Sequence, residues 1–171
     1  MRLAQCIPGF ALAALVGVTN VSAQPPATAR ARPPVTRLFA SSGNVDSMIA
    51  KAKRDHKPGQ AAVIEPLLHL APYNANLEYR TAVGPAAVHI HQNEFFYVIS
   101  GSGTLVTGGK LRHAVKTNAE NIRGDSIEGG TSTPVAKGDF IVVPQNTPHW
   151  FSAINGTLID MSLHVPGSRV P

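Results

Sequence analysis

Most of the chain alternates between short apolar runs and turn residues, and this pattern predicts strands. From Ala61 onward the runs are separated by Gly, Pro, Asn and Asp, which favour turns. Residues 110–125 lack a clear period and are expected to form a surface loop, and Gly129-Gly130 is expected to turn a hairpin. The pattern therefore indicates an all-β domain over residues 61–165. Its predicted strands are 62–70, 75–83, 88–91, 94–100, 104–107, 126–128, 132–135, 140–143, 150–154 and 157–165.

A different pattern precedes the strands. Residues 44–60 predict one short helix and a turn, because Met48, Ile49 and Ala52 form an apolar side at helical spacing. Ser42 or Asn44 is the expected N-cap, and Pro58-Gly59 is expected to end the segment. Residues 24–43 are rich in proline at their start and predict a flexible lead-in, and residues 166–171 predict a short tail.

The N-terminal 23 residues resemble a secretory signal. Arg2 precedes an apolar run from residue 7 to residue 18, and Val21-Ser22-Ala23 fits a small-residue cleavage site. The apolar run is too short to span a membrane. We therefore expect cleavage after Ala23, a periplasmic or secreted protein, and no membrane span in the mature chain.

Composition narrows the chemistry. Cys6 is the only cysteine and lies inside the predicted signal, so metal ligands in the mature chain would be His, Asp or Glu. The net charge of +5 is spread along the chain, without the aromatic-interleaved basic stripe that is typical of nucleic-acid binding. We expect a small-molecule partner and no nucleic acid.

The richest segment is 84–101, where three potential metal ligands fall within six residues: His89, His91 and Glu94. Residues two apart on a strand share a face, so His89 and His91 are expected to point into one interior. Glu94 can join them if the chain turns at Gln92-Asn93. Otherwise Glu94 would accept a hydrogen bond from a liganding imidazole.

A second segment, 138–149, offers a further ligand. Two turns flank the apolar strand 140–143, and the second turn delivers His149. Three histidines and a glutamate suit one divalent first-row metal ion, iron or manganese before zinc or nickel, and an octahedral ion would keep two positions open. The alternative is a domain that retains these polar residues without metal, although burying them unpaired is costly.

Other residues are candidates for the pocket around the ligands. Phe96, Val98 and Phe151 share strand parity with the ligands, and either Tyr79 or Arg80 could face the metal. The remaining histidines are expected at the surface or in satisfied positions. His164 is expected on an outward face with Asp160 and Ser162, opposite an apolar face of Met161, Leu163 and Val165.

These two segments resemble the paired motifs of the cupin superfamily. The first motif corresponds to Gly84, His89, His91, Glu94 and Gly101, and the second to Gly138, Pro144, Asn146 and His149. The spacers before His89 and before Glu94 are each one residue short, Asn146 replaces the usual glycine, and Ala153 replaces the usual final asparagine. The resemblance implies a small antiparallel, jelly-roll-like β-barrel with the metal inside, and frequent dimers, so a homodimer is among the expected states.

The motifs do not specify a reaction. We expect a metal-dependent enzyme that acts on a small organic molecule, with oxidoreductase or dioxygenase chemistry first and isomerase or lyase chemistry next. No residue beyond the ligands stands out as an acid or a base, so the catalytic residues stay unknown at this point. A non-catalytic module that binds a small ligand is the alternative, and a structural role is a third.

Overall fold

The computed structural model describes residues 36–168. The predicted signal sequence and most of the predicted lead-in lie outside these residues. The described residues all belong to one compact unit.

The helix α1 (Ser42–Asp55) agrees with the expected helix, but its N-cap is Ser41 rather than Ser42 or Asn44. The hydroxyl of Ser41 accepts a hydrogen bond from the backbone N–H of Asn44, whose side chain bonds back to the Ser41 N–H. This capping box satisfies two of the free donors at the start of the helix. The described helix is neither long nor apolar enough to cross a membrane.

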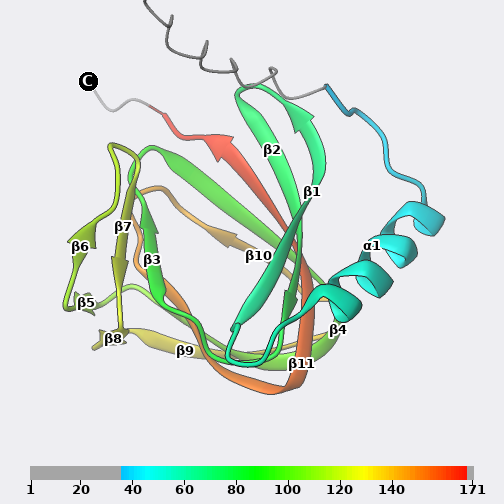
Figure 1. Cartoon of the computed structure of the whole chain (residues 1–171). Coiled ribbons are helices and arrows are strands. Elements are labelled where there is room, and N and C mark those ends of the chain that lie inside the picture. The colour runs from blue at the N-terminus through cyan, green and yellow to red at the C-terminus, as the bar shows by residue number, and fades with distance from the viewer. Residues whose placement is uncertain (1–35, 169–171) are drawn as a thin grey trace, which may run out of the picture. The chain divides into compact units, whose positions relative to one another are not determined.

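The rest of the unit is antiparallel β-structure, as the sequence predicts. A nine-stranded sheet curls around an interior, and β5 and β8 form a separate two-stranded sheet (Figure 1). The strands are β1 (Ala62–Leu70), β2 (Tyr73–Arg80), β3 (Ala86–His89), β4 (Gln92–Thr107), β5 (Lys110–Arg112), β6 (Val115–Lys116), β7 (Asn121–Gly124), β8 (Ser126–Glu128), β9 (Thr131–Ala136), β10 (Phe140–Val143) and β11 (His149–Pro166).

Two long strands organise the sheet. β11 pairs with β4 from His149 opposite Thr107 to Pro166 opposite Gln92, and its later half also pairs with β2. Three register shifts interrupt the β11–β4 pairing, between residues 151 and 160 of β11. Such irregularities bend a strand and change which residues face inward.

Two expectations about the middle of the chain are wrong. Residues 110–125 are not a loop, because they contain β5, β6 and β7, and β7 pairs with β3. Gly129-Gly130 does not join a hairpin of its flanking strands, because β8 pairs with β5 and β9 pairs with β4. These strands are too short to show a period in the sequence, and β7 also pairs with β3, which lies far from it along the chain.

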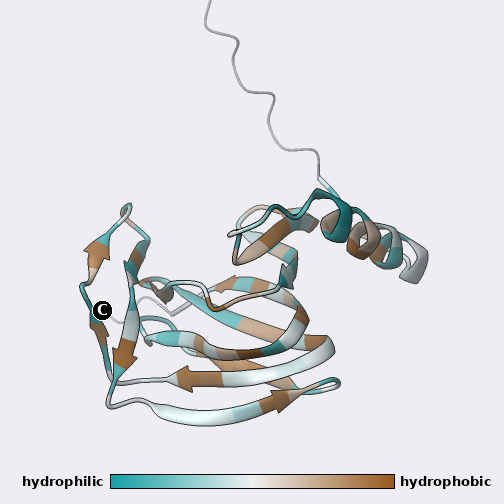
Figure 2. Ribbon diagram, turned by 60° about the horizontal axis from the view of Figure 1, so that its bottom comes forward, coloured by the Kyte–Doolittle hydropathy of each residue, from teal (hydrophilic) through white to brown (hydrophobic). Residues whose placement is uncertain are grey.

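Apolar side chains fill both sides of the curled sheet. One buried cluster lies inside it and includes Phe96, Val98, Leu105, Phe151 and Leu158. A second cluster lies under α1 and joins Ala52 to β-strand residues such as Leu77, Tyr79 and Ile159. Figure 2 shows the resulting alternation of apolar and polar segments along the strands. Burial on both faces explains why neighbouring residues of β11, Leu158 and Ile159, are both apolar.

Gly101 lets β4 pass β11 at very close range. Its φ is +82°, and a Cβ there would collide with the backbone carbonyl of Thr157 on β11. Gly156, at the nearby turn of β11, has a similar φ of +77° but open space around it. Both positions therefore require a positive φ, but only Gly101 also lacks room for a Cβ atom.

We predict that Gly101→Ala destabilises the fold more than Gly156→Ala. The control should cost about 1–2 kcal/mol for its positive φ, and Gly101→Ala should cost about 1–3 kcal/mol more for the collision. Urea unfolding followed by the fluorescence of Trp150 measures both. Equal losses of stability in the two variants would contradict the close approach of β4 and β11.

Candidate metal centre

The first ligand candidate, His89, is the last residue of β3. The chain then bends at Ile90 and His91, and β4 starts at Gln92. The corner therefore falls two residues earlier than expected. Because the strand ends at His89, the two-residue alternation does not extend to His91, which is exposed. The expectation that His89 and His91 share an interior is wrong.

Glu94 faces the interior from the start of β4. It shares a face with Phe96 and Val98, and its side chain is only 5% exposed. On a straight strand, Glu94 would face away from His89, because the two residues are an odd number of positions apart. The corner at Ile90 and His91 lies between them, so Glu94 faces inward without a turn at Gln92-Asn93.

β11 supplies two histidines, one at each end. His149 opens the strand, and His164, near its end, is paired with Glu94 of β4. The turn before His149 is tied to the end of β3, since the backbone N–H of Asn146 donates to the carbonyl of His89 at 2.7 Å. Asn146 adopts the left-handed backbone, with φ +58°, that its replacement of a motif glycine requires.

The inward position of His164 corrects the sequence expectation. Register shifts in β11 move the inward face from His149 and Phe151 to the even positions Leu158, Asp160, Ser162 and His164. Met161 and Leu163 lie on the other face, which also contains Ile159 under α1. In this part of β11 the polar face lines the interior, and the apolar face of Met161 and Leu163 lies on the opposite side of the sheet.

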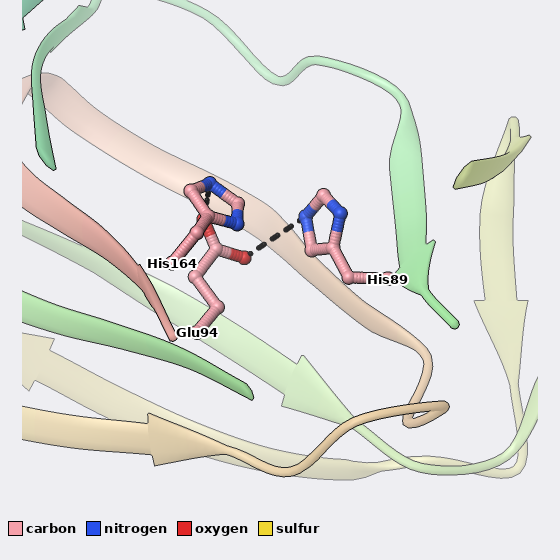
Figure 3. Close-up of side chains that lie close together, drawn as sticks. All are labelled: His89, Glu94 and His164. Atoms are coloured by element: carbon pink, nitrogen blue, oxygen red, sulfur yellow. Dashed lines mark ion pairs between the residues drawn. The ribbon is translucent and has the colours of Figure 1, made fainter. Parts of the chain in front are cut away.

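Glu94 is the centre of the cluster. Its Oε2 lies 3.2 Å from Nε2 of His89 and 2.9 Å from Nε2 of His149, and its Oε1 lies 3.3 Å from Nε2 of His164. Figure 3 shows His89 and His164 on either side of the carboxylate. Ligand atoms of His89, Glu94 and His164 all lie within 4.8 Å of one another, a separation that a single metal ion can bridge.

Hydrogen bonds fix how two of the rings present their nitrogens. The carbonyl of Thr147 can only accept, so Nδ1–H of His149 donates to it at 3.1 Å. His89 donates its Nδ1–H to Oδ1 of Asn121 at 2.6 Å, and the amide of Asn121 is oriented by its own bond to Asn118. A neutral ring that donates from Nδ1 carries a lone pair on Nε2. Both lone pairs then point at Oε2 of Glu94.

This arrangement fits a cation. Among the described residues, Oε2 of Glu94 is buried and has no hydrogen-bond partner despite the two nearby nitrogens. An oxyanion facing two lone pairs is stable only if positive charge lies between them, either as protons or as a metal ion. Bonds from Nδ1 to carbonyl oxygens are also the usual means of orienting metal-binding imidazoles.

The electrostatics of the group agree with a site for positive charge. Burial opposes ionisation of Glu94, yet its contacts with His149 and His89 hold the pKa of that carboxyl far below its usual range. Burial also opposes protonation of His89, but Glu94 raises the pKa of this ring. Burial lowers the pKa of His164, with the other two rings acting in the same direction. These contacts therefore favour the ionised form of Glu94 at the centre of the cluster.

The family of the chain follows from its sequence once this geometry is known. Residues 64–162 match the family model described as Cupin. The chain belongs to the cupin family. No curated protein is significantly similar in sequence.

Solved structures share the cupin fold at low identity. Protein BH2720 from Bacillus halodurans is 18% identical, with 78% of this chain and 84% of that chain covered and a TM-score of 0.51. An uncharacterized protein with a double-stranded β-helix domain from Klebsiella pneumoniae is 17% identical, with 78% and 93% covered and a TM-score of 0.51. Hydroxypropylphosphonic acid epoxidase from S. wedmorenis is 17% identical, with 62% and 51% covered and a TM-score of 0.46. This cupin thus spans about half the length of the epoxidase chain.

The four clustered residues of this cupin line one cavity of about 380 Å³. Of the predicted pocket residues, Phe96, Phe151 and Arg80 line it. Val98 instead belongs to the apolar cluster beside the cavity, and Tyr79 packs under α1. Residues from the segment expected to be a loop, including Asn118, Asn121 and Arg123, also line the cavity.

The sequence analysis named Arg80 as a pocket residue but missed the polar group that surrounds it in the same cavity. Arg80 donates from Nε to Oδ2 of Asp160 at 2.8 Å and from a terminal nitrogen to Oε2 of Glu78. The hydroxyl of Ser162 donates to the other oxygen of Glu78 at 2.7 Å. The guanidinium carbon of Arg80 lies 4.6 Å from the ring centroid of Phe151. The signal in the sequence was the alternation of polar residues along β2 and the end of β11.

Charge in this second group is unbalanced, because one guanidinium faces two buried carboxylates. Burial raises the pKa of Asp160 to about 7; Arg80 opposes this rise, and Glu78 adds to it. Burial lowers the pKa of Arg80, but the two carboxylates outweigh it and raise that pKa overall.

We predict a distinct pH dependence of stability for this second group in metal-free protein. The folded state retains a proton on Asp160 that the unfolded chain releases, so this group makes the free energy of unfolding fall between about pH 4 and about pH 7. The slope is at most about 1.4 kcal/mol per pH unit. Asp160→Asn should remove this slope, and urea unfolding of both proteins at several pH values measures it. If the difference in unfolding free energy between the parent protein and Asp160→Asn is the same at every pH, the raised pKa of Asp160 is contradicted.

Proposed function

We propose that this cupin binds one divalent metal ion through His89, Glu94, His149 and His164, and that it is a metal-dependent enzyme acting on a small organic molecule. The observation that carries the proposal is the buried Oε2 of Glu94, which has no hydrogen-bond partner and faces the Nε2 atoms of two imidazole rings whose Nδ1 atoms bond to oxygens. Mixed imidazole and carboxylate ligands suit iron, manganese, zinc or nickel, and we favour iron or manganese.

A metal ion explains the cluster better than protons alone. If each ring carried a second proton, three imidazolium cations would surround one buried carboxylate. Burial opposes this for His164, because it lowers the pKa of that ring. A single divalent ion neutralises the carboxylate and leaves all rings neutral, with their other nitrogens free for hydrogen bonds. His91 is not part of this proposal, because its side chain is exposed.

The proposed chemistry follows from the ion and the cavity. When bound, the metal ion would polarise an oxygen-bearing molecule or hold dioxygen beside it, so oxidation or dioxygenation comes first and isomerisation or lyase chemistry next. Phe96 and Phe151 give the cavity apolar surface for the substrate body, and Arg123 and Asn118 give polar groups for its ends. The same proposal includes export with cleavage after Ala23, which N-terminal sequencing of exported protein tests. The absence of a nucleic-acid role and the homodimer stay predictions.

The first prediction of the proposal concerns metal content. The full chain, purified without a histidine tag and supplied with iron or manganese, should contain close to one ion per molecule by mass spectrometry. His164→Ala removes a ligand, so it should weaken metal binding by at least about tenfold.

His91→Ala is the matched control, since it removes a nearby histidine that is exposed. It should bind metal like the parent protein. Loss of metal in His91→Ala with retention in His164→Ala would overturn the ligand set, and a folded parent protein that binds no metal would overturn the proposal itself.

A second prediction separates an enzyme from the alternative, a module that binds a small ligand without changing it. The apolar part of the cavity lining is the observation that favours the module. The iron- or manganese-loaded protein should consume dioxygen in the presence of a panel of small organic acids, phenols and sugars, and a His89→Ala, His149→Ala double variant should not. Thermal stabilisation by a compound that is then recovered unchanged would favour the binding module.

A further inference from the structure

The cavity contains two polar groups, and only one of them has a role in the proposed metal centre. The other consists of Glu78 and Arg80 from β2 and Asp160 and Ser162 from β11. Glu78 and Arg80 line the cavity together with His89, Glu94 and His164. Asp160 and Ser162 lie behind them and are fully buried.

The charges of this second group do not balance without a proton. Arg80 is the only cation in contact with the two carboxylates among the described residues, and on the β4 side Asp160 faces Val98, with the anionic Glu94 further along that strand. Two adjacent buried carboxylates against one guanidinium would leave an uncompensated negative charge. One proton shared between the carboxylates removes it.

The hydrogen bonds agree with this count. Oδ2 of Asp160 accepts from Arg80, whereas Oδ1 of Asp160 is buried without a partner among the described residues. Both oxygens of Glu78 accept hydrogen bonds, one from Arg80 and one from Ser162. A buried oxygen without a donor is tolerated far better on a neutral carboxyl group than on a carboxylate.

We propose that Glu78 and Asp160 form the acid–base pair of this cupin: they share one proton, and Glu78 exchanges it with a molecule bound in the cavity. This inference rests on the proposed function for the identity of that molecule. Glu78 is the catalytic residue of the pair, because it is the carboxylate that lines the cavity, and Asp160 is a positioning residue that acts through it.

The step transfers only a proton. The proton on Asp160 first moves to Glu78, its cross-strand partner, and Asp160 becomes the carboxylate. The O–H bond of Glu78 then breaks, the electron pair stays on its carboxylate, and the proton binds a lone pair on an oxygen of the bound molecule. Both carboxylates are then ionised against Arg80, and this excess negative charge favours return of a proton from the product or from water in the cavity. The pKa of Asp160, about 7, agrees with a pair that gives and takes a proton near neutral pH.

Infrared spectroscopy tests the pair without a known substrate, since protonated and ionised carboxyl groups absorb separately. The full chain at about pH 6, where ordinary exposed carboxyl groups are ionised, should show one protonated carboxyl group per molecule. Asp160→Asn and Glu78→Gln should each remove that band, because one carboxylate then remains for one guanidinium. Glu128→Gln, at an exposed carboxylate of β8, is the control and should keep the band.

Exchange into deuterated water distinguishes acid–base chemistry from a structural ion cluster. The band should shift before the backbone amides of β2 and β11 exchange, because Glu78 lines the cavity. No protonated band in the parent protein, or a band that shifts only with these amides, would overturn the proposal. Both measurements use the parent protein, so they stand if a variant fails to fold.

Metal content is measured on the same samples. Asp160→Asn and Glu78→Gln should bind metal like the parent protein, because neither residue contacts the metal cluster through a hydrogen bond or an ion pair in the described structure. A parent protein with the band but without metal would refute the proposed function alone, and one with metal but without the band would refute the acid–base pair alone.

Discussion

The pairing of β4 with β11 is the constraint on which the metal cluster and the rest of the sheet depend. The two strands run antiparallel along most of their lengths, and this register places His164 opposite Glu94 near the start of β4. His149, at the other end of β11, is paired with Thr107 and reaches Glu94 across the interior of the curled sheet. The close approach depends on Gly101, where no side chain could fit against Thr157. Backbone hydrogen bonds of this ladder hold His164 and Glu94 opposite each other without any help from a loop.

The same ladder creates an electrostatic problem in the interior. Glu78, Glu94 and Asp160 are all buried, and a buried carboxylate is costly unless positive charge accompanies it. The structure divides the three between two centres. Three imidazole rings surround Glu94, and one guanidinium serves Glu78 and Asp160. In the first centre the missing positive charge suits a metal ion, and in the second it suits a proton.

Residues of both centres line one cavity, so both centres could act on the same bound molecule. A metal centre that polarises a bound molecule changes the acidity of that molecule, and a nearby carboxyl pair can then accept or supply the proton. Phe151 connects the two centres. Its ring packs on Arg80 of one centre and on Phe96, and the ring of Phe96 lies near His149 of the other centre. The apolar ring limits water around the guanidinium and strengthens its interaction with the carboxylates.

The sequence by itself determined the fold class, the helix, the family resemblance and three of the clustered residues, His89, Glu94 and His149. These depend on local patterns: alternation, turn residues and motif spacing. The tertiary structure alone decided that His164 replaces His91 and that Asn121 orients His89. Strand parity decides which face a residue occupies. The early corner removes His91 from the strand, and the register shifts in β11 reverse the face that His164 occupies. Because both faces of β11 are partly buried, hydropathy could not reveal that reversal, and only the pairing of distant strands fixed it.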